Sequence, residues 1–214
     1  TESSEVTSMD SSAQAVISDT VRLETPVVSD SLLNQQYGSL GAYMTGTERS
    51  ITVENNQLSV TLSNKGGTFK QVELKKFKTY YQEPLYLVTP ETNTFSLLAN
   101  YEGRQVDLYQ LYYNGESKKQ GDSTLVIYTA NIGGSASIKH TYSIPATGYE
   151  IGYTLEAKGL TGLDGDVVTY NWHDLIPVQE KDLVDSRNKT TVNYYQVMDG
   201  FDHISETSSD PETE

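Results

Sequence analysis

The 214-residue chain contains no cysteine, which excludes disulfide bonds and zinc sites built on cysteine. It also has no apolar run near the roughly 18 residues that a membrane-spanning helix needs. The N-terminus lacks the basic region and apolar core of a secretion signal. As given, the chain is expected to be soluble.

The sequence also lacks the short motifs of nucleophilic and phosphate-binding sites. It has no GxSxG elbow, no GxxxxGK[ST] loop, and no GxGxxG after a predicted strand. Its three histidines, His140, His173 and His203, are not at metal-ligand spacing from one another. We interpret them as structural or surface residues. The sequence therefore predicts a protein that is not an enzyme, with no catalytic residue, no metal and no cofactor.

Basic residues are scarce, because 15 Lys and Arg stand against 29 Asp and Glu. Residues 1–50 carry seven acids and two bases, and residues 201–214 carry five acids and no base. The two ends thus account for ten of the fourteen net negative charges. This balance argues against a nucleic-acid partner and against docking on anionic lipid.

The pattern of the chain predicts one principal domain with distinct ends. The N-terminal stretch is rich in Ser, Thr, Asp and Glu without periodicity, as in a mobile linker. Leu33, Tyr37 and Leu40 then share one helical face. The predicted division is a flexible acidic linker (1–30), a short helix or turn (31–50), a β-sandwich domain (51–204) and an acidic disordered tail (205–214).

Short alternating runs predict an all-β, antiparallel sandwich. Leu58, Val60 and Leu62 are spaced two apart, and Gly66-Gly67 permits a hairpin turn after them. Further strands are predicted at 85–88, 105–113, 123–130, 136–144, 148–158, 166–173 and 190–198. Turn chemistry predicts breaks at 114–115, 131–134, 145–148 and 162–165.

Two groups of residues are candidates for an interaction surface. A small basic cluster near a predicted strand end consists of Lys75, Lys76 and Lys78. These lysines either contact lipid headgroups or form a solvent-exposed sheet edge that discourages aggregation. Trp172 and His173 stand together in a predicted strand. Tyrosine is abundant, with 16 residues against 4 Phe, which fits either an aromatic ligand cleft or ordinary packing of a sheet.

Several phrases of the sequence resemble the periplasmic domain of YidC-type membrane protein insertases of Bacteroidetes. They are LLNQQYGSLGAYMTGTE at 32–48, NQLSVTLSNKGGTFKQVELKKFKTY at 56–80, NWHD at 171–174, QEK at 179–181 and FDHISE at 201–206. The resemblance implies a β-supersandwich similar in fold to galactose mutarotase, of which this chain is the N-terminal part. If part of that fold is missing, one sheet face is bare, and we expect self-association of the fragment.

The resemblance also implies a place and a role. The whole protein would lie in the bacterial inner membrane, attached through segments absent from this chain, with this domain in the periplasm. It would insert and help fold membrane proteins, with secretion translocon components and nascent membrane proteins as partners. In the family the substrate groove lies among membrane helices, so no residue here inherits an insertion role. This domain would be a non-catalytic accessory.

The alternative is a carbohydrate-binding or mutarotase-like sandwich. Such chemistry needs a histidine acid and a carboxylate base a few ångströms apart around a sugar ring. His140 or His173 with Glu150 or Glu180 would have to supply them. Aromatic rings on an open groove would favour sugar binding, whereas buried or scattered rings would favour the interaction domain.

Overall fold

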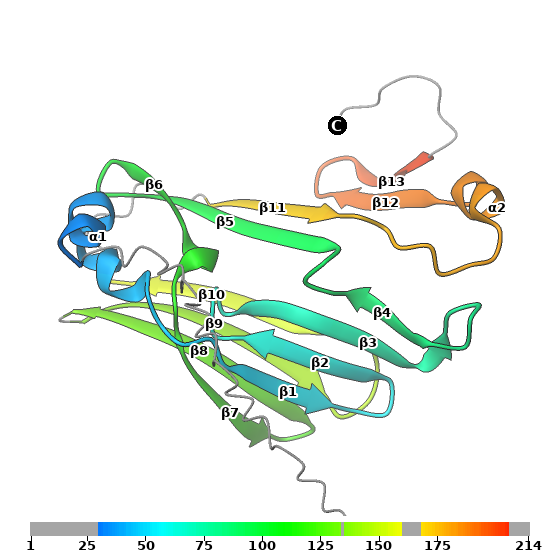
Figure 1. The fold of residues 1–214 in the computed structure, drawn as a ribbon, viewed down its shortest axis with the longest axis horizontal. Coiled ribbons are helices and arrows are strands. Elements are labelled where there is room, and N and C mark those ends of the chain that lie inside the picture. The colour runs from blue at the N-terminus through cyan, green and yellow to red at the C-terminus, as the bar shows by residue number, and fades with distance from the viewer. Residues whose placement is uncertain (1–29, 134, 160–167, 206–214) are drawn as a thin grey trace, which may run out of the picture.

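A computed structural model describes residues 30–133, 135–159 and 168–205. These residues form antiparallel sheets with two short α-helices (Figure 1), so the predicted all-β class and the short N-terminal helix are confirmed. Apart from Asp30 and Ser205, the predicted linker at 1–30 and tail at 205–214 lie outside the described residues, as does the predicted turn at 162–165.

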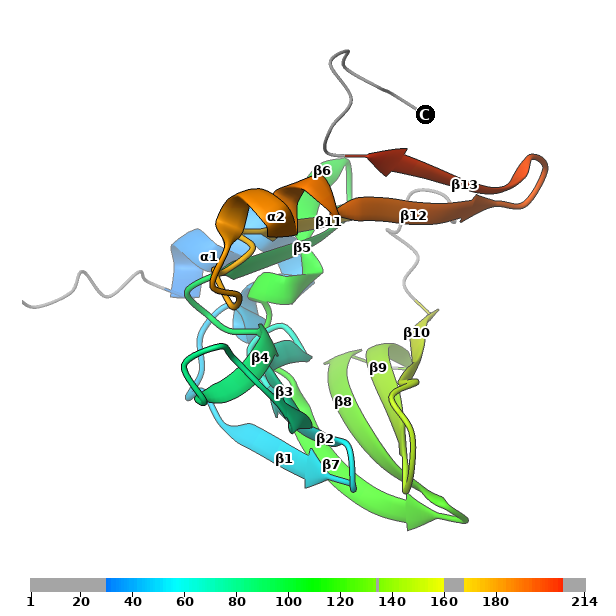
Figure 2. The same cartoon turned by 90° about the vertical axis from the view of Figure 1, so that its right-hand side faces the viewer.

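Two four-stranded antiparallel sheets form the body of the domain. The first runs in the order β1 (Ser50–Glu54), β2 (Leu58–Ser63), β3 (Thr68–Lys78), β4 (Pro84–Val88). The second runs in the order β10 (Gly152–Lys158), β9 (Ala136–Pro145), β8 (Ser123–Gly133), β7 (Asn114–Gln120). The sheets lie opposite each other and come together at β1 and β7 (Figure 2).

A third sheet and a separate hairpin complete the fold. The third sheet has the order β11 (Thr169–Asp174), β5 (Asn93–Tyr101), β6 (Arg104–Asp107), and the hairpin pairs β12 (Thr191–Gln196) with β13 (Gly200–Ser205). The helices are α1 (Asp30–Tyr37), α2 (Leu183–Asn188) and two 3₁₀ turns, Gly38–Tyr43 and Leu108–Gln110. In Figure 1 the hairpin lies outside the two facing sheets.

The core lies where the three sheets meet. Leu58, Val60 and Leu62 of β2 are buried, which confirms the alternation read from the sequence. Full burial of one such side chain contributes about 1.5–3 kcal/mol. Residues from all three sheets surround them, among them Val72, Leu97, Ala99, Val106, Val126, Ile138 and Ile144.

The predicted hairpin turn between β2 and β3 points into the space between the sheets. Gly66 and Gly67 have φ of +80° and +56°, in the left-handed region that glycine adopts without strain. The Gly66 N–H donates to the carbonyl of Leu111 at 2.7 Å. A side chain at Gly66 would collide with the backbone oxygen of Tyr109 at 2.5 Å. The turn therefore requires glycine for both conformation and space.

Two tyrosines of the second sheet satisfy backbone carbonyls of this same hairpin. The Tyr128 hydroxyl donates to the carbonyl of Leu62 at 3.0 Å, and the Tyr142 hydroxyl donates to the carbonyl of Gly67 at 2.8 Å. Both tyrosines are fully buried. A buried carbonyl without a partner destabilises a fold, so these two bonds attach the first sheet to the second.

Two local expectations were wrong. Asn114-Gly115 is not a turn but begins β7, and the hairpin reverses at Gly121 instead. The glycine at 115 has a packing reason, because a Cβ there would lie 2.5 Å from the ring of Tyr128. The predicted strand 105–113 ends at Asp107, whose carboxylate accepts from the N–H of Tyr109 and starts a 3₁₀ turn.

Replacing Gly67 with alanine should destabilise the fold more than replacing Gly121, by about 1 kcal/mol or more. The two glycines share a φ near +57°, so the left-handed penalty is common to both variants. At Gly67 the new Cβ would also meet His140 and Tyr128 at 3.1 Å, while Gly121 has nothing within 4 Å. Urea unfolding measures the difference, and equal losses in the two variants would contradict this account of the turn.

Candidate functional site

The titratable side chain of His140 lies in a buried aromatic cluster. Its side chain is fully buried, its Nδ1 is 2.8 Å from the hydroxyl of Tyr153, and its ring centroid is 4.7 Å from that of Tyr113. Its Nε2 has no hydrogen-bond partner among the described residues. Burial lowers its pKa to about 4, so the imidazole is neutral near pH 7.

This environment does not resemble a mutarotase acid–base pair. In the part of the chain that the structure describes, neither His140 nor His173 has an ion pair or hydrogen bond with a carboxylate, Glu150 and Glu180 included. The same residues contain no group of three or more His, Asp or Glu that could hold a metal ion. His140 is buried in the core, as predicted from its place on the apolar face of its strand.

Aromatic rings extend from His140 to the third sheet. Tyr109 contacts both His140 and Tyr170, with centroid distances of 5.8 and 6.3 Å. Phe95 then lies 6.4 Å from Tyr170 and 5.7 Å from Trp172, at shallow interplanar angles. The rings are buried at His140 and about half exposed at Tyr170 and Trp172. The network thus opens from the core onto the face of β11 and β5.

Trp172 and His173, paired as candidates in the sequence, point to opposite faces of β11. Trp172 lies opposite Phe95 across the strands, and its Nε1 donates to the side-chain oxygen of Asn93 at 2.6 Å. His173 lies opposite Thr94 and is exposed. Because adjacent strand residues face opposite ways, the two side chains do not form one surface.

The candidate lysines lie at the end of β3. The ammonium of Lys75 is 2.9 Å from the carboxylate of Glu54. Lys76 and Lys78 are two residues apart, so they lie on the opposite face of β3 from Lys75, and both are exposed. Just beyond them the N–H of Tyr80 donates to the carbonyl of Gln179 at 2.8 Å. The lysine end of β3 is therefore joined to the segment after β11. A role for the lysines stays a prediction.

Most of the exposed large apolar side chains lie in residues 168–205, and we call these side chains together the apolar C-terminal surface. Thirteen of the twenty exposed large apolar side chains of the described residues belong to it, and no described side chain within it is buried. Val197 and Met198, at the tip of the β12–β13 hairpin, are 88% and 91% exposed. The others include Trp172, Leu175, Ile176, Val178, Val184, Tyr195 and Phe201.

Sequence reasoning found Trp172 but missed most of this surface. The run Leu175-Ile176-Pro177-Val178 follows a strand without alternation, and Val197-Met198 stands between two strand-like runs. Apolar residues at a hairpin tip are unusual and were a usable signal. Whether these apolar side chains are exposed depends on whether other segments of the fold cover them. That could be seen only in the folded chain.

These features define an antiparallel β domain with an apolar surface exposed on one part of the chain. The family of YidC periplasmic domains matches residues 50–201, and the chain belongs to that family. No solved structure matches the chain, so the similarity to galactose mutarotase stays a prediction.

Curated relatives agree with this assignment. The chain is 39% identical over 98% of its length to the membrane protein insertase YidC of Cytophaga hutchinsonii, and 31% identical over 83% to that of Parabacteroides distasonis. It covers 34% and 28% of those proteins, so it spans about a third of their length. No helix among the described residues is long and apolar enough to cross a membrane.

The buried state of His140 predicts a loss of stability in acid. Its pKa is about 4 in the folded chain and takes the ordinary value of 6.5 when unfolded, so the unfolded chain binds the proton first. This contribution is fully present above pH 6.5 and is lost as the pH falls toward 4. From pH 7.5 to pH 5 the free energy of unfolding should fall by about 2 kcal/mol through this group.

Urea unfolding of the native chain and of His140→Phe at the two pH values tests this. The variant should lose less stability than the native chain over this range, because it lacks the titrating ring. His203→Phe, which changes an exposed histidine, should behave as the native chain does. An unchanged pH dependence in His140→Phe would contradict the assignment.

Proposed function

We propose that this chain is a non-catalytic accessory domain of a membrane protein insertase, located on the periplasmic side of a bacterial inner membrane. It contacts translocon subunits or nascent membrane proteins while other parts of the insertase insert them. Membership of the YidC periplasmic domain family supports this role, as do relatives that are named membrane protein insertases. Residues 1–30 and 205–214 serve as acidic spacers at its two ends.

The observation that carries the proposal is the apolar C-terminal surface. Monomeric proteins rarely expose contiguous apolar patches beyond a few hundred Å², and larger ones mark interaction sites. An isolated two-stranded hairpin is also only marginally stable in water, so β12 and β13 gain from a further contact. Tyr195 lies opposite Phe201 across this hairpin, and both rings are about 70% exposed. Such aromatic pairs supply binding energy when a partner covers them.

Carbohydrate binding is the second candidate, and one observation favours it. Tyr170, Phe95 and Trp172 form a row of rings on the third sheet, and two of them are half exposed. A row of this kind can stack against sugar rings. It is also continuous with the buried cluster around His140, as expected for ordinary packing of the core.

Site-specific photo-crosslinking in the full-length protein tests the proposal. Probes at Tyr195, Val197 and Phe201 should capture translocon subunits or nascent membrane proteins, because these side chains of the β12–β13 hairpin are 71%, 88% and 69% exposed. A probe at Lys118 on the polar strand β7 is the matched exposed control. Equal capture at Lys118, or capture of no protein at the hairpin, would count against the accessory role.

The apolar C-terminal surface also predicts self-association of the 214-residue chain, as expected for a bare face. Sedimentation over a hundredfold concentration range should show a monomer–dimer equilibrium. Changing Tyr195 and Phe201 to serine should weaken it about tenfold or more, since each aromatic contributes area to the contact. Tyr149→Ser, which changes an exposed tyrosine in the turn between β9 and β10 of the second sheet, should leave it unchanged. A monomer throughout would contradict the prediction.

A further inference from the structure

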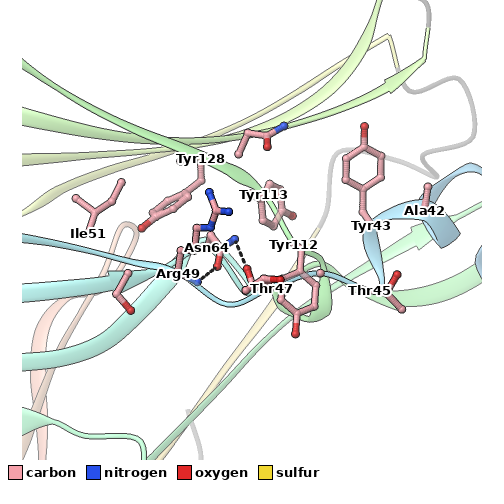
Figure 3. A pocket seen from close by; sticks show the side chains of 14 residues that line it. Ala42, Tyr43, Thr45, Thr47, Arg49, Ile51, Asn64, Tyr112, Tyr113 and Tyr128 are labelled. Atoms are coloured by element: carbon pink, nitrogen blue, oxygen red, sulfur yellow. Dashed lines mark hydrogen bonds between the residues drawn. The ribbon is translucent and has the colours of Figure 1, made fainter. Parts of the chain in front are cut away.

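A pocket of about 570 Å³ opens where the first and second sheets come together. Its walls come from the segments 42–51 and 112–115, with Asn64 and Tyr128 behind them. Figure 3 shows tyrosine rings around it, contributed by Tyr43, Tyr112 and others from three different segments. Its volume is in the range that holds a small group of a ligand.

One cation stands in this pocket. The backbone of Arg49 is held in place, because its N–H donates to the side-chain oxygen of Asn64 at 2.6 Å and its carbonyl accepts from the Asn64 N–H at 2.9 Å. In Figure 3 its guanidinium rises between Tyr128 and Tyr113. Within the described residues the Arg49 guanidinium makes no ion pair and no hydrogen bond, although it carries five N–H donors.

The carboxylate next to it in sequence is already paired elsewhere. Glu48 is 2.8 Å from the ammonium of Lys70 and accepts from the hydroxyl of Ser63 at 2.9 Å. The hydrogen bonds from Lys70 and Ser63, together with the charge of Lys70, lower the pKa of Glu48 and keep it ionised there. Glu48 is thus paired with Lys70 and Ser63, and it does not neutralise the charge of Arg49.

The lining of the pocket contrasts with the rest of the chain. The protein carries 29 acidic residues, but none of the residues that line this pocket is acidic. The lining instead carries neutral hydrogen-bond donors, namely the amide of Asn114 and the hydroxyls of Thr45, Thr47, Ser50 and Tyr112. A site with one arginine, neutral donors and aromatic walls is complementary to a single carboxylate.

We propose that this pocket binds the carboxylate of an acidic side chain carried by an extended polypeptide segment. The planar fork of Arg49 pairs with both carboxylate oxygens, which is the geometry that gives arginine its preference for this group. Neutral donors such as Asn114 complete the shell, and the tyrosine rings cover the apolar stem of the side chain. The polypeptide source rests on the proposed function, in which emerging segments pass this domain, whereas the carboxylate chemistry rests on the pocket alone.

An NMR titration of the 214-residue chain tests the inference. The probe is an acetylated and amidated nonapeptide of glycine and serine with one central glutamate. It should shift the amide signals of Thr47, Ser50 and Asn114 in a saturable way. The same peptide with glutamine at the centre should bind about tenfold more weakly or worse, because a charged hydrogen-bonded pair is lost.

Two charge-matched variants locate the effect. Arg49→Gln should weaken binding of the glutamate peptide by about tenfold or more, while Arg104→Gln, which removes an exposed arginine from β6, should leave it unchanged. Arg49→Lys should lie between them, since it keeps the charge and loses the fork. Equal effects of Arg49→Gln and Arg104→Gln, or equal binding of the glutamine peptide, would overturn the proposal.

A third peptide distinguishes the source of the carboxylate. It has glutamine at the centre and a free C-terminus, and it should bind no better than the blocked glutamine peptide. If it alone binds, the site recognises chain ends, and the assignment to side chains is wrong. These outcomes do not depend on capture at Tyr195 or Phe201, so failure of the accessory role and failure of the carboxylate site can be told apart.

Discussion

The attachment of the Gly66-Gly67 turn to the second sheet is the contact on which the rest of the domain depends. It brings two backbone carbonyls into the interior, and buried hydroxyls of Tyr128 and Tyr142 bind them. A buried carbonyl is tolerated only with such a partner. Once the turn is held there, the apolar sides of both sheets face one core, and His140 is enclosed beside Gly67.

Buried side chains are unevenly distributed along the chain. Every strand from β2 to β9 except β7 contributes at least one buried side chain, whereas β11, α2 and the β12–β13 hairpin contribute none among the described residues. The domain therefore has a firmly packed body and a part that is held mainly by backbone pairing. That second part carries most of the exposed apolar side chains. A region that does not pack inward is available for contact with another polypeptide.

The candidate functional features follow this division. The carboxylate pocket belongs to the packed body, where Arg49 is held by backbone bonds to Asn64. The apolar C-terminal surface belongs to the less packed part. Trp172 links the apolar C-terminal surface, to which it belongs, with the core, since its ring contacts Phe95 and so joins the aromatic network that ends at His140. The two proposed surfaces therefore differ in chemistry and packing, since one is polar and lies in the packed body, while the other is apolar and has no buried side chain among the described residues.

The sequence by itself determined the antiparallel β class, the hairpin at Gly66-Gly67 and the burial of β2, because alternation and glycine chemistry are local signals. The family was indicated by the resemblance of several phrases of the sequence, not by these patterns. It misread Asn114-Gly115, since the glycine there makes room for Tyr128, which lies on a neighbouring strand. It also paired Trp172 with His173, which the alternation of β11 separates. Only the tertiary structure placed Arg49 among tyrosines from distant segments and left residues 168–205 uncovered. Burial and exposure depend on which remote segments meet, and no local pattern contains that information.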